Sequence, residues 1–330
     1  MAAMDAVLRI LEAHRGETVS GEQIAADLRL TRAAVWKAVS GLKDRGFRIA
    51  AGSNRGYTLE SDGGRLHPET IRRHLRASGD FALQVFDEAP GSTNDLVREA
   101  AVRGEPEGLV VIADTQRAGR GRQGRTFVSP PGTGVYMSLL LRPKLPAEEA
   151  VAVTGIAAVA VARAIADVGG GRAGIMWVND ITLRGRKVCG ILTEATMDME
   201  SGGLDYAVLG IGVNLFPPAG GFPPELADIA GAVFPGTPED DERSRLIAAI
   251  LDRFLPLYRA LPDRGWLEEY RSRSILTGRD VRFIREGRES FGRVLGVDDA
   301  ARLLLRLPSG EETALSSGEV QLIRPLEVQE

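Results

Sequence analysis

Apolar residues in the first 60 positions repeat first at helical and then at strand spacing. Residues 20–23 read as a capping box that opens a helix through Leu28, and Thr31 is a good N-cap for a longer helix ending near Arg45. A short turn separates these two helices, which predicts a helix-turn-helix. An earlier helix has its apolar face at Val7, Ile10 and Leu11.

The longer helix has two different faces. Its apolar side consists of Val35, Val39 and Leu42. The other side can enter a major groove, and the candidate DNA contacts on it are Arg32, Ala33, Trp36, Lys37 and Ser40. Two short strand patterns, 47–50 and 57–59, flank a polar tip where Arg55 is placed to reach phosphate. Residues 1–66 are therefore predicted to form a winged-helix DNA-binding domain.

Charge supports this interpretation locally but not globally. The whole chain has a formal net charge of -4, yet residues 31–48 hold five cations and one acid. Such a concentration of cations favours binding to phosphates. Two alternatives stay open, a helical domain with a solvated basic face and a winged helix used for protein contacts.

The next region, residues 67–274, alternates strand and helix patterns. A linker-like segment, 61–68, leads to Pro68, which suits the first turn of a helix. An Ala-rich run at 151–162 predicts a core helix, and helices between 243 and 270 are expected to break at Pro256 and Pro262. We expect an α/β domain with a mixed sheet. Its strand patterns lie at 86–90, 176–194 (a hairpin around Gly185) and 208–215.

The remaining residues, 275–330, change to short strands separated by turns. This pattern predicts a small β-barrel and makes the whole chain an α+β multidomain protein. The Pro- and Gly-rich segment 216–224 is a candidate lid, in which Phe216 or Phe222 supplies an apolar cover. An ordinary surface loop is the alternative. The strand candidates of the tail are 281–284, 291–295, 302–307 and 313–315.

Composition excludes several classes of protein. The chain has 330 residues, 44% of them apolar, and one cysteine, Cys189, so an internal disulfide framework is excluded and a reducing cytoplasm is expected. The apolar run 151–162 is too short for a membrane span. The three histidines, at 14, 67 and 74, are too scattered for a zinc site.

The strongest chemical signal is the loop TQRAGRGRQGRTFVS at residues 115–129. Three arginines, Arg120, Arg122 and Arg125, alternate with glycines there. Glycines let the backbone approach a ligand, and guanidinium groups donate forked hydrogen bonds to carboxylate and phosphate oxygens. The loop therefore predicts an anion site, with a flexible basic loop as the alternative.

Four motifs in order, between Phe86 and Leu215, resemble the catalytic domain of biotin protein ligase. They are FDEAPGSTND, the arginine loop, MWVNDITLRGRKVCGILTE and VLGIGVNL. Members of this family adenylate biotin and transfer it to a carrier-protein lysine. The C-terminal strands are similar to the SH3-like domain of these ligases, with Gly318 and Glu319 matching an element near the active site.

The resemblance assigns roles to individual residues. It implies that Lys187, Arg120 and Arg122 are catalytic. The chemistry also needs Mg²⁺ on the pyrophosphate, for which Asp180 is a candidate ligand or a residue that anchors a ligand; holding the hairpin turn is the structural alternative. The biotin contacts it implies are Ser92, Thr93, Asn94, Gln116, Arg120, Gly121, Arg122 and Lys187. The nucleotide contacts it implies are Arg122, Arg125, Phe127, Trp177, Asn179, Asp180 and Asn214.

Two positions depart from the family pattern. Met176 replaces the lysine of the usual K-W-P-N-D sequence, which puts some phosphate affinity in doubt, and Phe127 replaces a common tryptophan. Joining a carboxylate to the α-phosphorus of ATP brings two anions together, so Arg120, Arg122 and Lys187 are the cation types that the reaction needs.

The resemblance implies a bifunctional ligase and repressor. Its substrates are biotin and ATP with Mg²⁺, its partners are biotin carboxyl carrier protein and operator DNA, and it is expected to form a homodimer when adenylate is bound and not to bind membranes. Two alternatives are a lipoate-type ligase, which shares the adenylate chemistry, and a biotin-sensing repressor without transfer activity. Lys187 favours transfer, since a sensor needs recognition alone.

Overall fold

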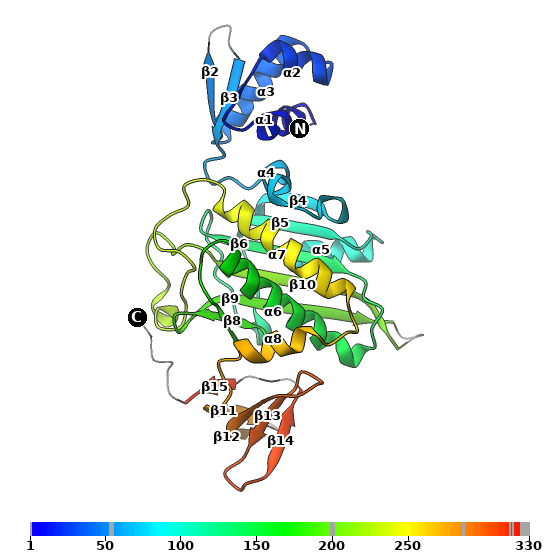
Figure 1. The fold of residues 1–330 in the computed structure, drawn as a ribbon, viewed down its shortest axis with the longest axis vertical. Coiled ribbons are helices and arrows are strands. Elements are labelled where there is room, and N and C mark those ends of the chain that lie inside the picture. The colour runs from blue at the N-terminus through cyan, green and yellow to red at the C-terminus, as the bar shows by residue number, and fades with distance from the viewer. Residues whose placement is uncertain are drawn as a thin grey trace.

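The computed structural model describes residues 2–52, 56–198, 202–285, 288–316, 318 and 320–323. The chain forms a helical unit with a small sheet, a central seven-stranded sheet covered by helices, and a five-stranded C-terminal sheet. These units follow one another along the long axis of the molecule (Figure 1). The predicted α+β multidomain class is confirmed at this level.

The N-terminal unit contains the predicted helix-turn-helix. The Ser20 hydroxyl accepts the Gln23 amide, and the Thr31 hydroxyl accepts the Ala34 amide, so both residues are N-caps. The predicted capping box at 20–23 is only half formed, because the Gln23 side chain donates to Asp27 instead of to the Ser20 amide. Arg55 lies outside the described residues. The elements are α1 (Ala2–Ala13), β1 (Thr18–Val19), α2 (Gly21–Leu28), α3 (Arg32–Asp44), β2 (Arg48–Gly52) and β3 (Gly56–Ser61), with strand order β1-β3-β2.

The central sheet is mixed, as predicted. Its order is β4-β5-β6-β10-β9-β8-β7, and β4 and β5 are its one parallel pair among the described residues. Arg184 and Gly185 have φ of 49° and 73° and close the β8–β9 hairpin, which confirms the turn at Gly185. The strands are β4 (Ala82–Ala89), β5 (Leu109–Gln116), β6 (Gly134–Leu141), β7 (Gly174–Met176), β8 (Asp180–Leu183), β9 (Arg186–Met197) and β10 (Leu204–Asn214).

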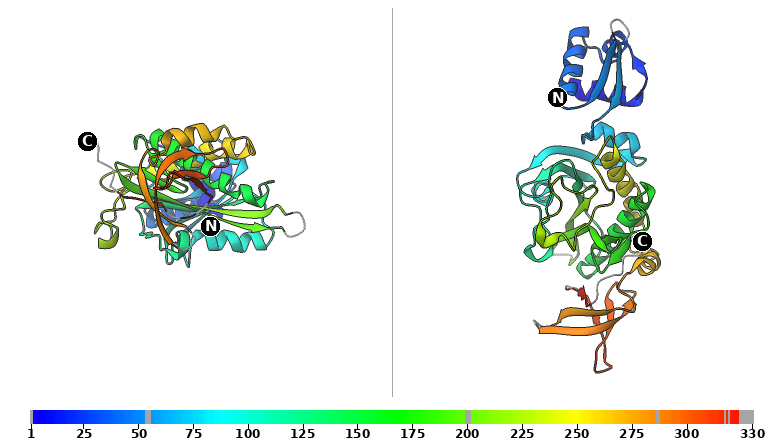
Figure 2. Two further views of the ribbon diagram at one scale, coloured as in Figure 1. Left: turned by 90° about the horizontal axis from the view of Figure 1, so that it is seen from below. Right: turned by 90° about the vertical axis from the view of Figure 1, so that its left-hand side faces the viewer.

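Helices cover both faces of this sheet (Figure 2). On one face, α5 (Thr93–Val102) packs on β5, β6 and β10 through a small apolar cluster that includes Val97 and Val208. The other face carries the main core under α6 (Ala150–Asp167) and α7 (Glu242–Arg259). Shorter helices are α4 (Pro68–His74), α8 (Trp266–Arg273), η1 (Ser78–Asp80), η2 (Arg122–Gly124), η3 (Ala147–Glu149) and η4 (Pro224–Leu226).

Two sequence predictions about these helices were wrong in detail. Helix α6 extends to Asp167, so it has 18 residues and is long and apolar enough for a membrane span, but 72% of it is buried in the core of this fold. Pro256 lies inside α7 and does not end it. The helix continues one turn because Leu257 and Tyr258 still pack on the core, which offsets the hydrogen bond that proline cannot donate.

The C-terminal unit is β-rich, as predicted. Its order is β14-β13-β12-β11-β15, and among the described residues the two outer strands do not pair with each other, so no closed barrel forms. Its buried residues, such as Val281 and Phe283, belong to the same apolar cluster as the central domain. The strands are β11 (Asp280–Arg285), β12 (Arg288–Val297), β13 (Leu303–Arg306), β14 (Glu312–Leu315) and β15 (Val320–Leu322).

The junction with the N-terminal unit is polar instead. The apolar core of the N-terminal unit is separate from that of the central domain, and charged pairs connect the two units. Arg9 bonds Glu69 at 3.0 Å, and Arg15 bonds Asp240 at 2.5 Å. Between them Asp62 is fully buried, and burial raises the pKa of its carboxyl to about 7, although the Gly64 amide donates to it.

Candidate functional site

A cavity of about 550 Å³ lies where β5, β6, β9 and β10 meet the arginine loop and the loop after β10. Every residue that the sequence assigned to biotin or to the nucleotide lines this cavity. The structure therefore brings together segments that are up to 122 residues apart, from Ser92 to Asn214.

One end of the cavity is a buried turn at the start of α5. Ser92 is the N-cap of α5, and its backbone amide donates to Asp95. Gln116 on β5 organises the turn, because its side-chain oxygen accepts the Thr93 amide at 2.8 Å and the hydroxyls of Ser92 and Thr93 at 3.1 and 3.2 Å. The Gln116 amide group donates to Ser129 at 2.8 Å. The side-chain polar atoms of Ser92, Thr93 and Gln116 therefore all have partners within the protein.

Asn94 completes the same turn. Its side-chain oxygen accepts the Ser138 hydroxyl at 2.6 Å, and its amide group donates to Glu194 at 2.6 Å. A Cβ at Gly210 would lie 2.3 Å from the Asn94 oxygen, so the glycine makes room for this side chain. Ser138 was missed by the sequence argument. Its signal was a polar residue inside the otherwise apolar strand β6.

The arginine loop folds back on itself over the cavity. The Gly121 amide donates to the Arg125 carbonyl at 2.7 Å, and the Phe127 amide donates to the Gly119 carbonyl at 2.8 Å. A Cβ at Gly119 would lie 2.3 Å from the Phe127 carbonyl oxygen, which explains the glycine. The Phe127 ring sits on the bare backbone of Gly212 and meets Tyr136 edge to face.

The first two arginines of the loop have different partners. Arg120 lies 2.8 Å from Asp95 and 3.1 Å from Glu194. Arg122 donates to the Asn179 side-chain oxygen at 3.0 Å. The sequence argument treated both as anion contacts, whereas the structure holds Arg120 between two carboxylates that it did not include.

The other end of the cavity is the β8–β9 hairpin. Lys187 lies 2.7 Å from Asp180, and Asn179 donates to Asp180 at 3.1 Å and to the Ile191 carbonyl at 2.9 Å. Asp180 therefore holds the hairpin side chains together, as its structural interpretation expects. Within the described ranges no group of three His, Cys, Asp or Glu residues is placed to hold a metal ion.

Two residues beside this hairpin are buried. Trp177 is 4% exposed and donates its indole N–H to the Ala301 carbonyl at 3.0 Å, so it ties the cavity wall to the C-terminal sheet. Cys189 is buried in the core, as expected, and burial raises the pKa of its thiol.

The loop after β10 covers the Lys187 side of the cavity. Phe216 is buried against Phe234, so it belongs to the core, whereas Phe222 lines the cavity. The covering segment also extends past 224, since the Lys187 amide donates to the Ile229 carbonyl at 2.8 Å. No pattern in the sequence indicated this part of the cover. Gly318 also lines the cavity, and Glu319 lies outside the described residues.

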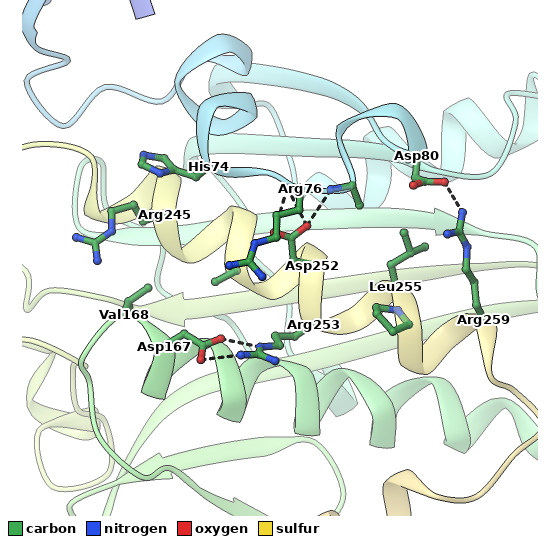
Figure 3. Close-up of a pocket in the computed structure, with 13 residues that line it drawn as sticks. His74, Arg76, Asp80, Asp167, Val168, Arg245, Asp252, Arg253, Leu255 and Arg259 are labelled. Carbon is green, nitrogen blue, oxygen red and sulfur yellow. Dashed lines mark hydrogen bonds and ion pairs between the residues drawn. The ribbon is translucent and has the colours of Figure 1, made fainter. Parts of the chain in front are cut away.

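A larger hollow, of about 830 Å³, lies on the outer side of α7 (Figure 3). Several of its charged groups pair with one another, since Arg253 bonds Asp167, Arg259 pairs with Asp80, and Asp252 accepts the Arg76 backbone amide. It contains none of the candidate ligase residues. The smaller cavity is the candidate active site for this reason.

The DNA-binding candidates lie on the open side of α3. Val35, Val39 and Leu42 are buried, as predicted. Trp36 is 65% exposed, as a side chain on the open face of the helix would be. Arg32, Ala33 and Lys37 are exposed and Ser40 is half-buried.

Three family models match the chain. Residues 4–58 match an HTH domain, residues 90–214 match the biotin/lipoate A/B protein ligase family, and residues 277–323 match the biotin protein ligase C-terminal domain.

Similar proteins point the same way. The chain is 35% identical to the bifunctional ligase/repressor BirA of Bacillus subtilis, over 89% of this chain and 91% of that protein, and 30% identical to BirA of Escherichia coli, over 92% and 95%. Among solved structures it resembles a biotin protein ligase from Aquifex aeolicus in complex with biotin and ATP, with a TM-score of 0.60, 26% identity, and coverage of 73% of this chain and 98% of that one. The chain therefore belongs to the biotin protein ligase family, and to its bifunctional ligase/repressor members.

Proposed function

We propose that this chain joins biotin to ATP, giving biotinoyl-5'-AMP and pyrophosphate, and then transfers biotin to a lysine of biotin carboxyl carrier protein. It also binds operator DNA as a biotin-responsive repressor. The observation that carries the ligase assignment is one cavity with a buried, prearranged polar turn at one end and the Arg122 and Lys187 cations at the other.

The residues divide the work between recognition and charge. The turn at Ser92, Thr93 and Asn94, with Gln116, recognises biotin and sets the direction of its carboxylate. That carboxylate attacks the α-phosphorus of ATP, a C–O–P bond forms, and pyrophosphate leaves with the electrons of the broken P–O bond. Lys187 and Arg122 exchange Asp180 and Asn179 for oxygens of the reacting anions and stabilise the charge that develops on phosphate.

The remaining assignments concern the nucleotide and the metal. Arg125, Phe127, Asn179 and Asn214 contact the nucleotide, and Trp177 supports the wall behind it. The single carboxylate of Asp180 fits Mg²⁺ that is held mainly by phosphate oxygens and water. When bound, Mg²⁺ neutralises the pyrophosphate that leaves.

Transfer and regulation use the same intermediate. Gly121 and the loop at 216–230 shield the adenylate from water until the carrier lysine attacks its carbonyl carbon and AMP leaves. Adenylate-bound chains form a homodimer, which presents two α3 helices to a two-fold operator. Arg32, Ala33, Trp36, Lys37, Ser40 and Arg55 contact that DNA. We place the protein in the cytoplasm, with domains at 1–66, 67–274 and 275–330, the last related to SH3-like barrels.

The ligase test uses the full chain with ATP, labelled biotin and a carrier domain. We expect label on the carrier lysine and release of pyrophosphate. Labelled lipoate in place of biotin separates the lipoate-type alternative, and tight biotin binding without carrier labelling would identify a pure sensor.

The repressor test is a gel shift on the upstream DNA of the biotin-synthesis genes, with and without biotin and ATP. Binding should require ligand and should weaken with salt. Lys37→Ala and Arg55→Ala should lose DNA affinity while they keep carrier labelling, and Lys144→Ala, which removes an exposed cation of the central domain, should keep both. DNA binding that ignores ligand would contradict the coupled switch.

A further inference from the structure

Four charged side chains form a closed network behind the arginine loop. Arg98 on α5 lies 3.0 Å from Asp95 and 2.8 Å from Glu194, and Arg120 lies 2.8 Å from Asp95 and 3.1 Å from Glu194. Two carboxylates and two guanidinium groups thus neutralise each other. Glu194 is not among the residues to which a role in the reaction was assigned above.

A single oxygen of Glu194 joins two parts of the site. Its Oε2 accepts the Asn94 amide at 2.6 Å and the Arg120 Nη2 at 3.1 Å, whereas its Oε1 faces Arg98. Asn94 belongs to the turn and Arg120 to the loop. Glu194 does not itself line the cavity, so its effect reaches a ligand through these two side chains.

Arg120 has a second notable property. Its Nη2 is fixed between Asp95 and Glu194, while its Nε is buried and has no hydrogen-bond partner among the described residues. A guanidinium group is planar and rigid, so fixing one nitrogen restricts the direction of the others. A buried donor without a partner is costly, so the two carboxylates on Nη2 are what hold this guanidinium in place.

We propose that Glu194 is a positioning residue for biotin activation. It orients the Asn94 amide group and the Arg120 guanidinium, so that the turn and the loop keep one spacing around biotin. This inference rests on the proposed ligase function. Arg120 then acts as an oriented cation beside the turn, and Arg122 and Lys187 supply the charge at the hairpin end.

Two effects of removing the Glu194 carboxylate oppose each other. The network would gain net positive charge, which favours anions, but its members are about one-third exposed and such charges are well screened. Asn94 is only 3% exposed, and its amide group would lose its partner. The loss of orientation should therefore outweigh the gain in charge, and biotin binding should weaken.

Three variants separate positioning from general stability. Glu194→Ala removes every contact of this side chain. Glu194→Gln can keep one oxygen as the acceptor for Asn94 and Arg120, and it loses only the ion pair with Arg98. Arg98→Ala removes the outer partner, which touches neither the cavity nor Asn94. We expect the KM for biotin in pyrophosphate release to rise about tenfold in Glu194→Ala, about threefold in Glu194→Gln and less than twofold in Arg98→Ala.

The KM for ATP provides the internal control, because Lys187 and Asp180, which are proposed to act on the phosphates and Mg²⁺, do not contact this network. It should change less than twofold in all three variants, and biotinoyl-5'-AMP should dissociate faster from Glu194→Ala. Equal losses in Glu194→Ala and Arg98→Ala, or parallel rises in both KM values together with a lower melting temperature, would overturn the inference. An inactive wild-type chain would instead refute the ligase function itself.

Discussion

The two ends of the cavity stabilise their polar groups with different kinds of interaction. At the turn, Ser92, Thr93 and Asn94 are each at most 5% exposed, and uncharged groups satisfy most of their hydrogen bonds. At the hairpin, the Lys187 and Asp180 side chains are 32% and 18% exposed and form an ion pair. The turn is thus a buried hydrogen-bond network, and the hairpin carries a partly exposed ion pair.

This difference suits two different tasks. Side chains that are already ordered lose little conformational entropy when they bind a neutral, hydrogen-bonding ligand such as a ureido ring. The network at the turn therefore favours recognition. A partly exposed ion pair has little net stability and can exchange its carboxylate for a phosphate oxygen at small cost. If recognition and catalysis are separated in space as proposed above, substitutions at the two ends should have different kinetic signatures.

Lys187→Ala should give the largest effect and mark the hairpin as the catalytic end. Without this cation, charge on the reacting phosphate is unopposed, so we expect adenylation to slow about 10²-fold or more while biotin affinity changes little. Pyrophosphate release and equilibrium biotin binding measure the two quantities. Lys144→Ala is the control, and a near-normal rate in Lys187→Ala would remove the catalytic assignment.

Gln116→Ala should show the opposite signature at the turn. The substitution leaves the Thr93 amide and two hydroxyls without their shared acceptor, so we expect the KM for biotin to rise about tenfold and folding stability to fall by about 1–3 kcal/mol. Thermal unfolding and pyrophosphate kinetics test this. Gln123→Ala replaces an exposed glutamine of the arginine loop and should leave the KM for biotin and the folding stability unchanged. A lower kcat with a normal KM in Gln116→Ala would contradict the assignment of recognition to the turn.

Arg122→Gly tests whether the two ends must stay closed together. Because Arg122 bridges the loop to Asn179, its loss should let biotinoyl-5'-AMP escape several-fold faster and label bystander lysines. A chase with unlabelled adenylate measures the escape rate. Arg117→Gly, at a 68% exposed side chain paired with Glu88, is the matched control. An unchanged escape rate would leave the Arg122 contact without a role in retention.

Met176→Lys should give the smallest effect and only at the hairpin end. Met176 lines the cavity where related ligases carry a lysine, so a new cation should lower the KM for ATP about threefold, and salt should weaken the gain. Met197→Lys adds the same charge at an exposed position of β9 and should do nothing. A fall in the KM for biotin instead would mean that the two ends are not independent.

The local signals in the sequence were sufficient for most elements. Ser20 and Thr31 set their helix starts through short-range hydrogen bonds, and the Gly185 turn fixes the hairpin, so each was predictable from neighbouring residues. The pairing of Arg120 with Glu194 was not, because it joins residues 74 apart and depends on the register of β9. Pro256 was misjudged since tertiary packing outweighed a local preference.

The separate apolar core of the N-terminal unit has an evolutionary consequence. Losing that unit would uncover mainly polar groups such as Glu69 and Asp240, which water solvates readily, and would leave the catalytic core covered. A gene fusion or deletion at this junction can therefore give a lineage transcriptional control, or remove it, while the biotin-coupling enzyme stays folded.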